Sequence, residues 1–182
     1  MTSIIKVDQI QTAAGGVPTA GDLGLNTSGN VVAVYNSIST LQNQTISTAG
    51  LVNIAGLSIT MTPKNANNLL VMEAVIQNTK TYVCSYAFLK DGALTAPATN
   101  SANNSISNVQ LTSYLGFATT QQGYVDNTPL MHYENAVNTS QRTYTVACTS
   151  TWSGTGQTMR VNNRDSNDMS AYSYFRITEI AG

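Results

Sequence analysis

The residue best suited to proton transfer at neutral pH occurs once in this chain, as His132. Any Ser-His-Asp or Cys-His arrangement would have to use this histidine as its base. Its neighbours Tyr133 and Glu134 lie in sequence of strand character, and the chain has no nucleophile-elbow motif and no Gly-rich phosphate loop. We therefore interpret His132 as a hydrogen-bonded strand residue, and we expect the protein not to be an enzyme.

Paired carboxylates are the second chemistry to consider, because glycosidases use two of them across the scissile bond. Asp126 and Glu134 flank an aromatic stretch that contains Tyr124 and Tyr133. Spacing along the chain does not say whether the two carboxylates face each other. Solvated loop charges are our default interpretation, and a sugar-cleaving site is the alternative.

Metal binding is suggested only by residues 162–168, Asn-Asn-Arg-Asp-Ser-Asn-Asp, which are dense in the oxygen donors that calcium prefers. The segment lacks the spacing of a known calcium loop, and Arg164 in its middle would weaken cation binding, so we interpret it as a turn. Cys84 and Cys148 have no Cys-x-x-Cys spacing and lie in apolar strand patterns. We expect both to be small buried hydrophobic residues, and we expect no metal and no cofactor.

Exposed aromatic side chains are the remaining candidates for a binding site. Trp152 precedes a Ser-Gly-Thr-Gly segment, where its ring would stack on a sugar or a partner protein, or else pack at the end of a strand. Tyr124, Tyr133 and Trp152 are therefore the candidate ligand-binding residues.

The composition excludes several functional classes. Charged residues make up 9% of the chain, the net charge is −1, and Thr, Asn and Ser together make up 61 of the 182 residues. Eight scattered Lys and Arg residues give no phosphate-tracking stripe, so nucleic acid is not an expected partner. The sequence shows neither a signal-peptide pattern nor 18 consecutive apolar residues, so we expect no secretion and no membrane insertion. Low charge is tolerated by subunits of permanent assemblies.

The chain divides into two regions of different texture. Residues 1–42 are rich in Gly, Ala and Thr and contain a single aromatic residue, Tyr35, so they cannot bury much surface alone. Residues 43–182 read as a succession of short strands. We expect an N-terminal segment that anchors the protein and trimerises (1–42), followed by a head domain (43–182).

Strand patterns dominate the second region. Residues 69–76 are apolar at seven of eight positions, which predicts a strand covered on both faces. Alternating patterns at 82–89, 142–150 and 172–180 predict further strands, the last with Phe175 and Ile177 on one face and Tyr174 and Arg176 on the other. Asp91-Gly92 offers a hairpin turn after the first of these. Weaker candidates lie at 57–61, 110–117, 130–137 and 159–161. About eight short strands without a helical repeat predict an all-β, antiparallel β-sandwich of jelly-roll type behind an extended N-terminal segment.

Both ends of the chain resemble a known class of proteins. The opening Ile4-Ile5-Lys6-Val7-Asp8-Gln9-Ile10-Gln11-Thr12, the following Gly15-Gly16-Val17-Pro18 and the closing Phe175-Arg176-Ile177-Thr178-Glu179-Ile180-Ala181-Gly182 are similar to those of fibre-like virion proteins of marine bacteriophages. The resemblance implies a homotrimer, with N-terminal segments attached to the virion and a jelly-roll head facing outward. It does not distinguish a tail fibre from a head fibre or capsid decoration protein.

Our leading hypothesis is therefore a structural protein of a bacteriophage virion, made in the cytoplasm of the host bacterium. We expect Ile4, Ile5, Val7 and Ile10 to become buried only between chains or against another virion protein, tail or capsid. The rival hypotheses are a decoration protein without a receptor role, an adhesin that binds a host-surface glycan, and a secreted lectin-like module.

Overall fold

The computed structural model describes residues 28–42, 44–48, 50–79, 84–95, 110–112, 125–149, 159–163 and 170–182. All regular elements in these ranges are strands, and none of these residues is helical. Thr, Val, Ile and Tyr favour this outcome, because branched and flat side chains fit a pleated surface. The strands are β1 (Val31–Ser39), β2 (Gln44–Ile46), β3 (Val52–Met61), β4 (Leu69–Thr79), β5 (Cys84–Lys90), β6 (Ala93–Leu94), β7 (Gln110–Thr112), β8 (Asp126–Asn135), β9 (Arg142–Thr149), β10 (Met159–Val161) and β11 (Ser173–Ile180).

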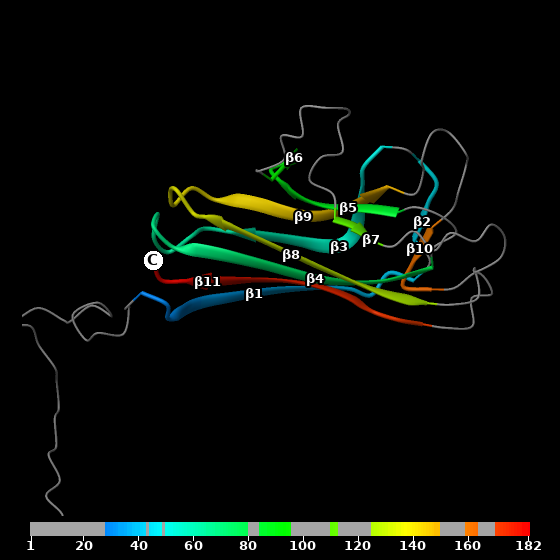
Figure 1. The fold of residues 1–182 in the computed structure, drawn as a ribbon, viewed down its shortest axis with the longest axis horizontal. Coiled ribbons are helices and arrows are strands. Elements are labelled where there is room, and N and C mark those ends of the chain that lie inside the picture. The colour runs from blue at the N-terminus through cyan, green and yellow to red at the C-terminus, as the bar shows by residue number, and fades with distance from the viewer. Residues whose placement is uncertain are drawn as a thin grey trace, which may run out of the picture.

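The strands form two sheets, called sheet A and sheet B here, that lie one over the other (Figure 1). Sheet A has the order β8-β4-β11-β1, and β10 and β2 continue it where β4 extends past β11. Sheet B has the order β3-β9-β5, and β6 and β7 both pair with β5. Every pairing between these strands is antiparallel. The predicted antiparallel β-sandwich is confirmed.

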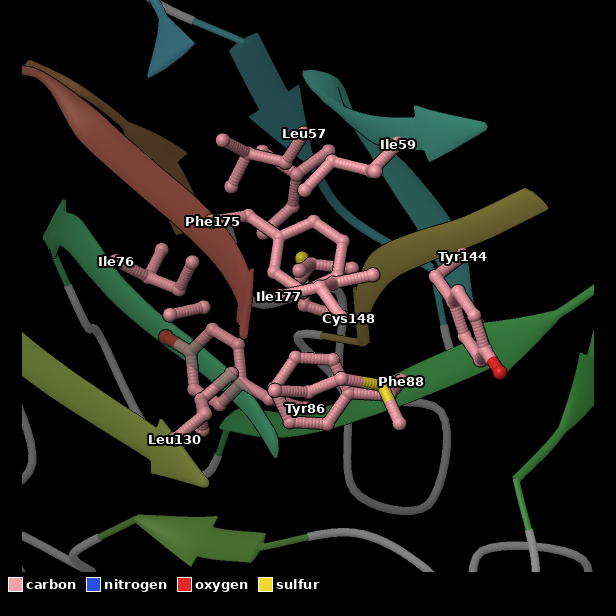
Figure 2. Packing of buried hydrophobic residues seen from close by; sticks show 14 of the residues in the cluster. Leu57, Ile59, Ile76, Tyr86, Phe88, Leu130, Tyr144, Cys148, Phe175 and Ile177 are labelled. Carbon is pink, nitrogen blue, oxygen red and sulfur yellow. The ribbon is translucent and has the colours of Figure 1, made fainter. Parts of the chain in front are cut away.

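The core lies between the two sheets, because each central strand turns every second side chain inward. Phe175 and Ile177 of β11 are fully buried and face Tyr86 and Phe88 of β5 in Figure 2. The rings of Phe88 and Phe175 lie 5.5 Å apart between centroids. Burial of side chains of this size stabilises the fold by about 1.5 to 3 kcal/mol each. The predicted alternation of residues 172–180 is thus confirmed, and Phe175 and Ile177 form the inward face.

β4 departs from its prediction. Leu70, Met72 and Ile76 are completely buried in the core, but the alternate residues Val71 and Val75 are only partly buried. The described chain therefore covers one face of β4 and leaves the other open, although the apolar run predicted cover on both.

β1 belongs to the sandwich. Residues Val31–Ser39 pair with β11 in antiparallel register, so their backbone groups on that side are satisfied within one chain. The sequence analysis placed this strand in the anchoring segment. Residues 1–27, with Ile4, Ile5, Val7 and Ile10, lie outside the described residues, and their anchoring role stays a prediction.

The predicted turn at Asp91-Gly92 is present. Both residues have positive φ, 50° and 81°, which is the geometry of a two-residue hairpin, and they join β5 to β6. The Asp91 carboxylate also accepts a hydrogen bond from the backbone N–H of Thr143 at 2.8 Å. This contact ties the turn to the neighbouring strand β9.

Candidate functional site

His132 lies on β8 and is half-buried, with its ring 6.2 Å from that of Phe88 between centroids. Its strand position is as predicted, but Nε2 is buried and has no hydrogen-bond partner among the described residues. Burial lowers the pKa of His132, and the nearby Glu134 carboxylate opposes that shift. Within the described chain Nε2 therefore contacts no nucleophile that it could deprotonate, which is consistent with a packing role.

Asp126 and Glu134 do not form a glycosidase pair. They are eight positions apart on the same strand, β8. At about 3.4 Å per residue this separation is about 27 Å, whereas glycosidase carboxylates stand roughly 5 to 10 Å apart. The default interpretation of these residues as loop charges is also wrong, because both belong to strand β8 of sheet A.

Glu134 instead has two structural partners. One of its oxygens accepts hydrogen bonds from Lys90 Nζ at 2.8 Å and from the Tyr144 hydroxyl. Burial and the hydrogen bond to Glu134 raise the pKa of Tyr144. The three side chains join β8 of sheet A to β5 and β9 of sheet B, so the carboxylate crosslinks the sandwich.

The proposed turn at 162–168 is described only at Asn162 and Asn163. Asn162 is buried and donates hydrogen bonds to the carbonyl oxygens of Ser39 and Leu41, and its own carbonyl oxygen accepts one from Ser173 Oγ. The Asn162 side-chain oxygen is thus already engaged within the fold. Among the described residues no group of three His, Cys, Asp or Glu side chains could hold a metal ion.

The cysteine prediction is confirmed for one residue. Cys148 is completely buried in the core on β9. The side chain of Cys84 lies outside the described residues.

Only one of the three candidate ligand-binding aromatics can be placed. Tyr133 is 68% exposed on β8, while Tyr124 and Trp152 lie outside the described residues. A shared glycan site for the three residues therefore stays a prediction. Tyr133 is one of several apolar side chains on the same surface.

That surface is the face of sheet A turned away from the core, called the outer face of sheet A below. Cross-strand register arranges its side chains in rows that run from β8 through β4 and β11 to β1. The rows are Tyr133, Val71, Thr178 and Val34; then Met131, Glu73, Arg176 and Asn36; then Pro129, Val75, Tyr174 and Ile38. Two largely apolar rows thus flank a row with a charged centre.

The charged centre is an ion pair between neighbouring strands. Arg176 donates to one Glu73 oxygen through both Nε and Nη2, at 3.1 and 2.6 Å. The hydrogen bond and the charge of Glu73 raise the pKa of Arg176. The side chains keep 43% and 29% exposure for Arg176 and Glu73, so both remain accessible to a partner.

The outer face of sheet B is built differently. Hydroxyl side chains pair across β3 and β9: Ser58 with Thr145 at 3.2 Å and Thr60 with Thr143 at 2.8 Å. Apolar residues on this face, such as Ala87 and Leu89, are buried in a small separate cluster. No large hydrophobic residue among the described residues of sheet B is exposed.

The outer face of sheet A is a candidate site that was not predicted from the sequence. Val34, Ile38 and Met131 were not among the candidate residues, although each is 49% exposed or more. One signal in the sequence was the apolar run at 69–76, which predicts a strand that is covered on both faces. Finding the rest of the surface requires the register of β1 against β11, at opposite ends of the described chain.

Comparisons with known proteins give no family. No family model matches the chain, and no curated protein matches it. The solved structures with weak similarity to this chain include the following two. One is the structure of infectious bursal disease virus Gt strain, at 11% identity and a TM-score of 0.39, covering 82% of this chain and 38% of that one. The other is dimeric latent PorU from Porphyromonas gingivalis, at 8% identity and a TM-score of 0.28, covering 85% of this chain and 14% of that one.

The similar regions span less than half of either solved chain. No helix in the described residues is long and apolar enough to cross a membrane.

Proposed function

We propose that this chain is a structural protein of a bacteriophage virion, a short trimeric fibre or surface knob that is held on the particle through its N-terminal segment. One observation supports this above the others. The outer face of sheet A carries rows of exposed apolar side chains, whereas the described residues of sheet B expose no large hydrophobic side chain. This difference is expected of a subunit rather than of a free monomer. The low charge of 9% agrees, since it weakens the repulsion between copies.

The strand order supports a jelly-roll head. Along the chain the longer strands alternate between sheets A and B. They are neighbours in the order β8-β4-β11-β1 in sheet A and β3-β9-β5 in sheet B, where the short strand β7 also pairs with β5. Double sheets of this kind, with eight strands in two Greek keys, occur in viral capsid and lectin domains. We assign the sandwich to this type.

The anchor consists of residues 1–27 in this proposal, and Ile4, Ile5, Val7 and Ile10 supply its apolar contacts. The described chain begins beside its own C-terminal end, where Gly29 N–H donates to the Ala181 carbonyl oxygen at 2.8 Å. The anchor therefore leaves the head at the end where β11 finishes.

Deletion of residues 1–20 tests the anchor. The truncated protein should keep the melting temperature of the full chain but should be lost from purified particles. A matched control replaces Lys6 and Asp8 by Ser and keeps the isoleucines; this variant should incorporate normally. Normal incorporation of the truncated protein would reject the anchor.

A second candidate function is adhesion to a host-surface glycan, with or without the decoration role. Tyr133 favours it, because an exposed tyrosine ring stacks well on a sugar. Binding to host polysaccharide that is lost in Tyr133→Ala and kept in Tyr172→Ala would support this function. Absence of binding to every host polysaccharide would count against it.

A further inference from the structure

The exposed large hydrophobic side chains of the described chain gather on one sheet. All of them lie on β1, β8 or β11 or within two residues of the ends of these strands. They are Val31, Val34, Ile38, Leu41, Met131, Tyr133, Val137, Tyr172 and Tyr174. Such clustering differs from the scattered apolar residues that any soluble surface carries, and it marks an interaction surface.

We infer that a second copy of this chain docks on the outer face of sheet A. The inference rests on the proposed function in one respect, namely that the chain works as an assembled subunit. It goes further because it assigns a two-fold contact between two copies to the head domain, distinct from the trimerisation that we expected of residues 1–42 from the sequence.

The residue pattern of β4 favours a second copy as the partner. Its sequence is apolar on both faces, as in strands that are covered on both sides, yet sheet B covers only one of them. Val71 and Val75 on the open side are flanked by Tyr133 and Tyr174 on the neighbouring strands. A partner sheet packed on these rows would bury Val71 and Val75 as well, as the apolar sequence of β4 predicts.

Charge complementarity also favours a second copy. Glu73 and Arg176 lie side by side at the centre of the face, so the face presents one negative and one positive group. A second copy presents the same two groups and can place its Arg176 near Glu73 of the first. A partner whose charges are all of one sign would repel either Glu73 or Arg176. A wholly apolar partner would bury both charges and offer neither a hydrogen bond nor an opposite charge.

The size of the outer face of sheet A fits a contact between copies. The face consists of four strands that lie about 4.8 Å apart, and each strand has about nine residues with a rise of about 3.3 Å per residue. Its dimensions are therefore roughly 19 by 30 Å. Side-chain relief makes the accessible area larger than this plan area, so it approaches the roughly 800 Å² per partner of a standard interface. The face is large enough for a specific contact between copies.

Charge exchange between two variants of the full chain tests the inference. Glu73→Arg places two arginines on the face, and Arg176→Glu places two glutamates there. Each variant alone should weaken self-association by about tenfold or more, because like charges then meet across the interface. A one-to-one mixture of the two should recover the mass of the wild-type assembly in light scattering at low salt.

Matched controls separate docking from folding. Thr60→Arg and Thr145→Glu make the same kinds of change on the outer face of sheet B and should leave the assembly mass unchanged. Ile38→Asp, which leaves the ion pair intact, should also weaken association. Melting curves of all variants should stay close to wild type under dissociating dilution.

Three results would overturn the inference: a monomeric wild-type chain at high micromolar concentration, single variants that keep the wild-type mass, or a mixture that stays dissociated. Incorporation into particles is measured separately with the wild-type chain. Self-association through this face by a chain that is absent from purified virions would reject the proposed function and leave the contact between copies standing.

Discussion

The two outer faces of the sandwich differ in the polarity of the side chains that they present. On sheet B, hydroxyls of Thr and Ser pair across β3 and β9, and the apolar residues are buried. On sheet A, the corresponding positions carry valine, isoleucine and tyrosine around the Glu73–Arg176 ion pair. Antiparallel sheets usually alternate apolar and polar residues when one face meets solvent, and the paired hydroxyls of β3 and β9 in sheet B follow that rule.

This difference shows that a low charge content need not be spread evenly over a molecule. Thr, Asn and Ser make up a third of the chain, and they satisfy the surface of sheet B without charges. Their absence from much of sheet A is therefore a property of that face and not of the overall composition. The contrast between the faces is what a subunit with one free and one covered side would need.

The largest expected effect compares two neighbours on β11 that point to opposite faces. Phe175→Ala removes a fully buried ring from the core and should destabilise the head by about 3 to 5 kcal/mol. Tyr174→Ala, on the outer face where the ring is 42% exposed, should cost less than about 1 kcal/mol in the dissociated chain. Urea unfolding at a dilution that keeps the chain monomeric measures both. Equal losses would mean that the outer face is packed within one chain.

The second effect concerns the place where the edge strands of the two sheets meet. Gly56 of β3 has a φ of +80°, and an added Cβ would lie 3.1 Å from the Cα of Ser39 in β1. Gly56→Ala should therefore combine backbone strain with crowding and cost about 2 kcal/mol or more.

Gly92→Ala is the matched control for the Gly56 substitution. Its φ is +81°, but nothing lies within 4 Å of the added Cβ, so only the backbone strain of about 1 kcal/mol remains. Thermal melting of the two variants separates strain from crowding. A larger loss for Gly92→Ala would show that β1 and β3 do not approach closely.

A smaller effect compares the polar pairs of the two outer faces. Thr60→Val removes one hydroxyl of the pair with Thr143 and should cost less than about 1 kcal/mol, as cross-strand threonine pairs do. Glu73→Gln weakens an exposed ion pair and should also cost less than about 1 kcal/mol in the monomer. In the assembled protein, however, only the Glu73 change should lower stability further. Chemical unfolding at two protein concentrations distinguishes the cases.

Local patterns in the sequence were enough to predict the sandwich, the hairpin turn and the two alternating faces of β11. Alternation of Phe175 and Ile177 with polar residues needs no knowledge of partners. The position of β1 in sheet A could not be predicted this way, because it depends on the pairing of β1 with β11, which is distant in the sequence. The outer face of sheet A depends on the same pairing. Its rows become visible once the register of four strands is fixed.

The smallest expected effect is a pH dependence at the edge of sheet A. Edge strand β8 carries the half-buried His132, whereas edge strand β3 of sheet B has no titratable side chain. Burial lowers the pKa of His132 from 6.5, so the unfolded chain binds a proton more readily than the folded one. Stability should therefore be fully present above pH 6.5 and should fall as the pH decreases towards the lowered pKa of the folded state.

His132→Gln should remove this decline between pH 6.5 and about 5, above the range in which most carboxylates titrate. Glu134→Gln, which removes the charge that favours protonated His132, should steepen the decline although it also breaks the contacts to Lys90 and Tyr144. Melting temperatures measured across this window for the three proteins decide the matter. A decline that persists unchanged in His132→Gln would place the titrating group elsewhere and would remove β8 as the acid-sensitive edge of the sandwich.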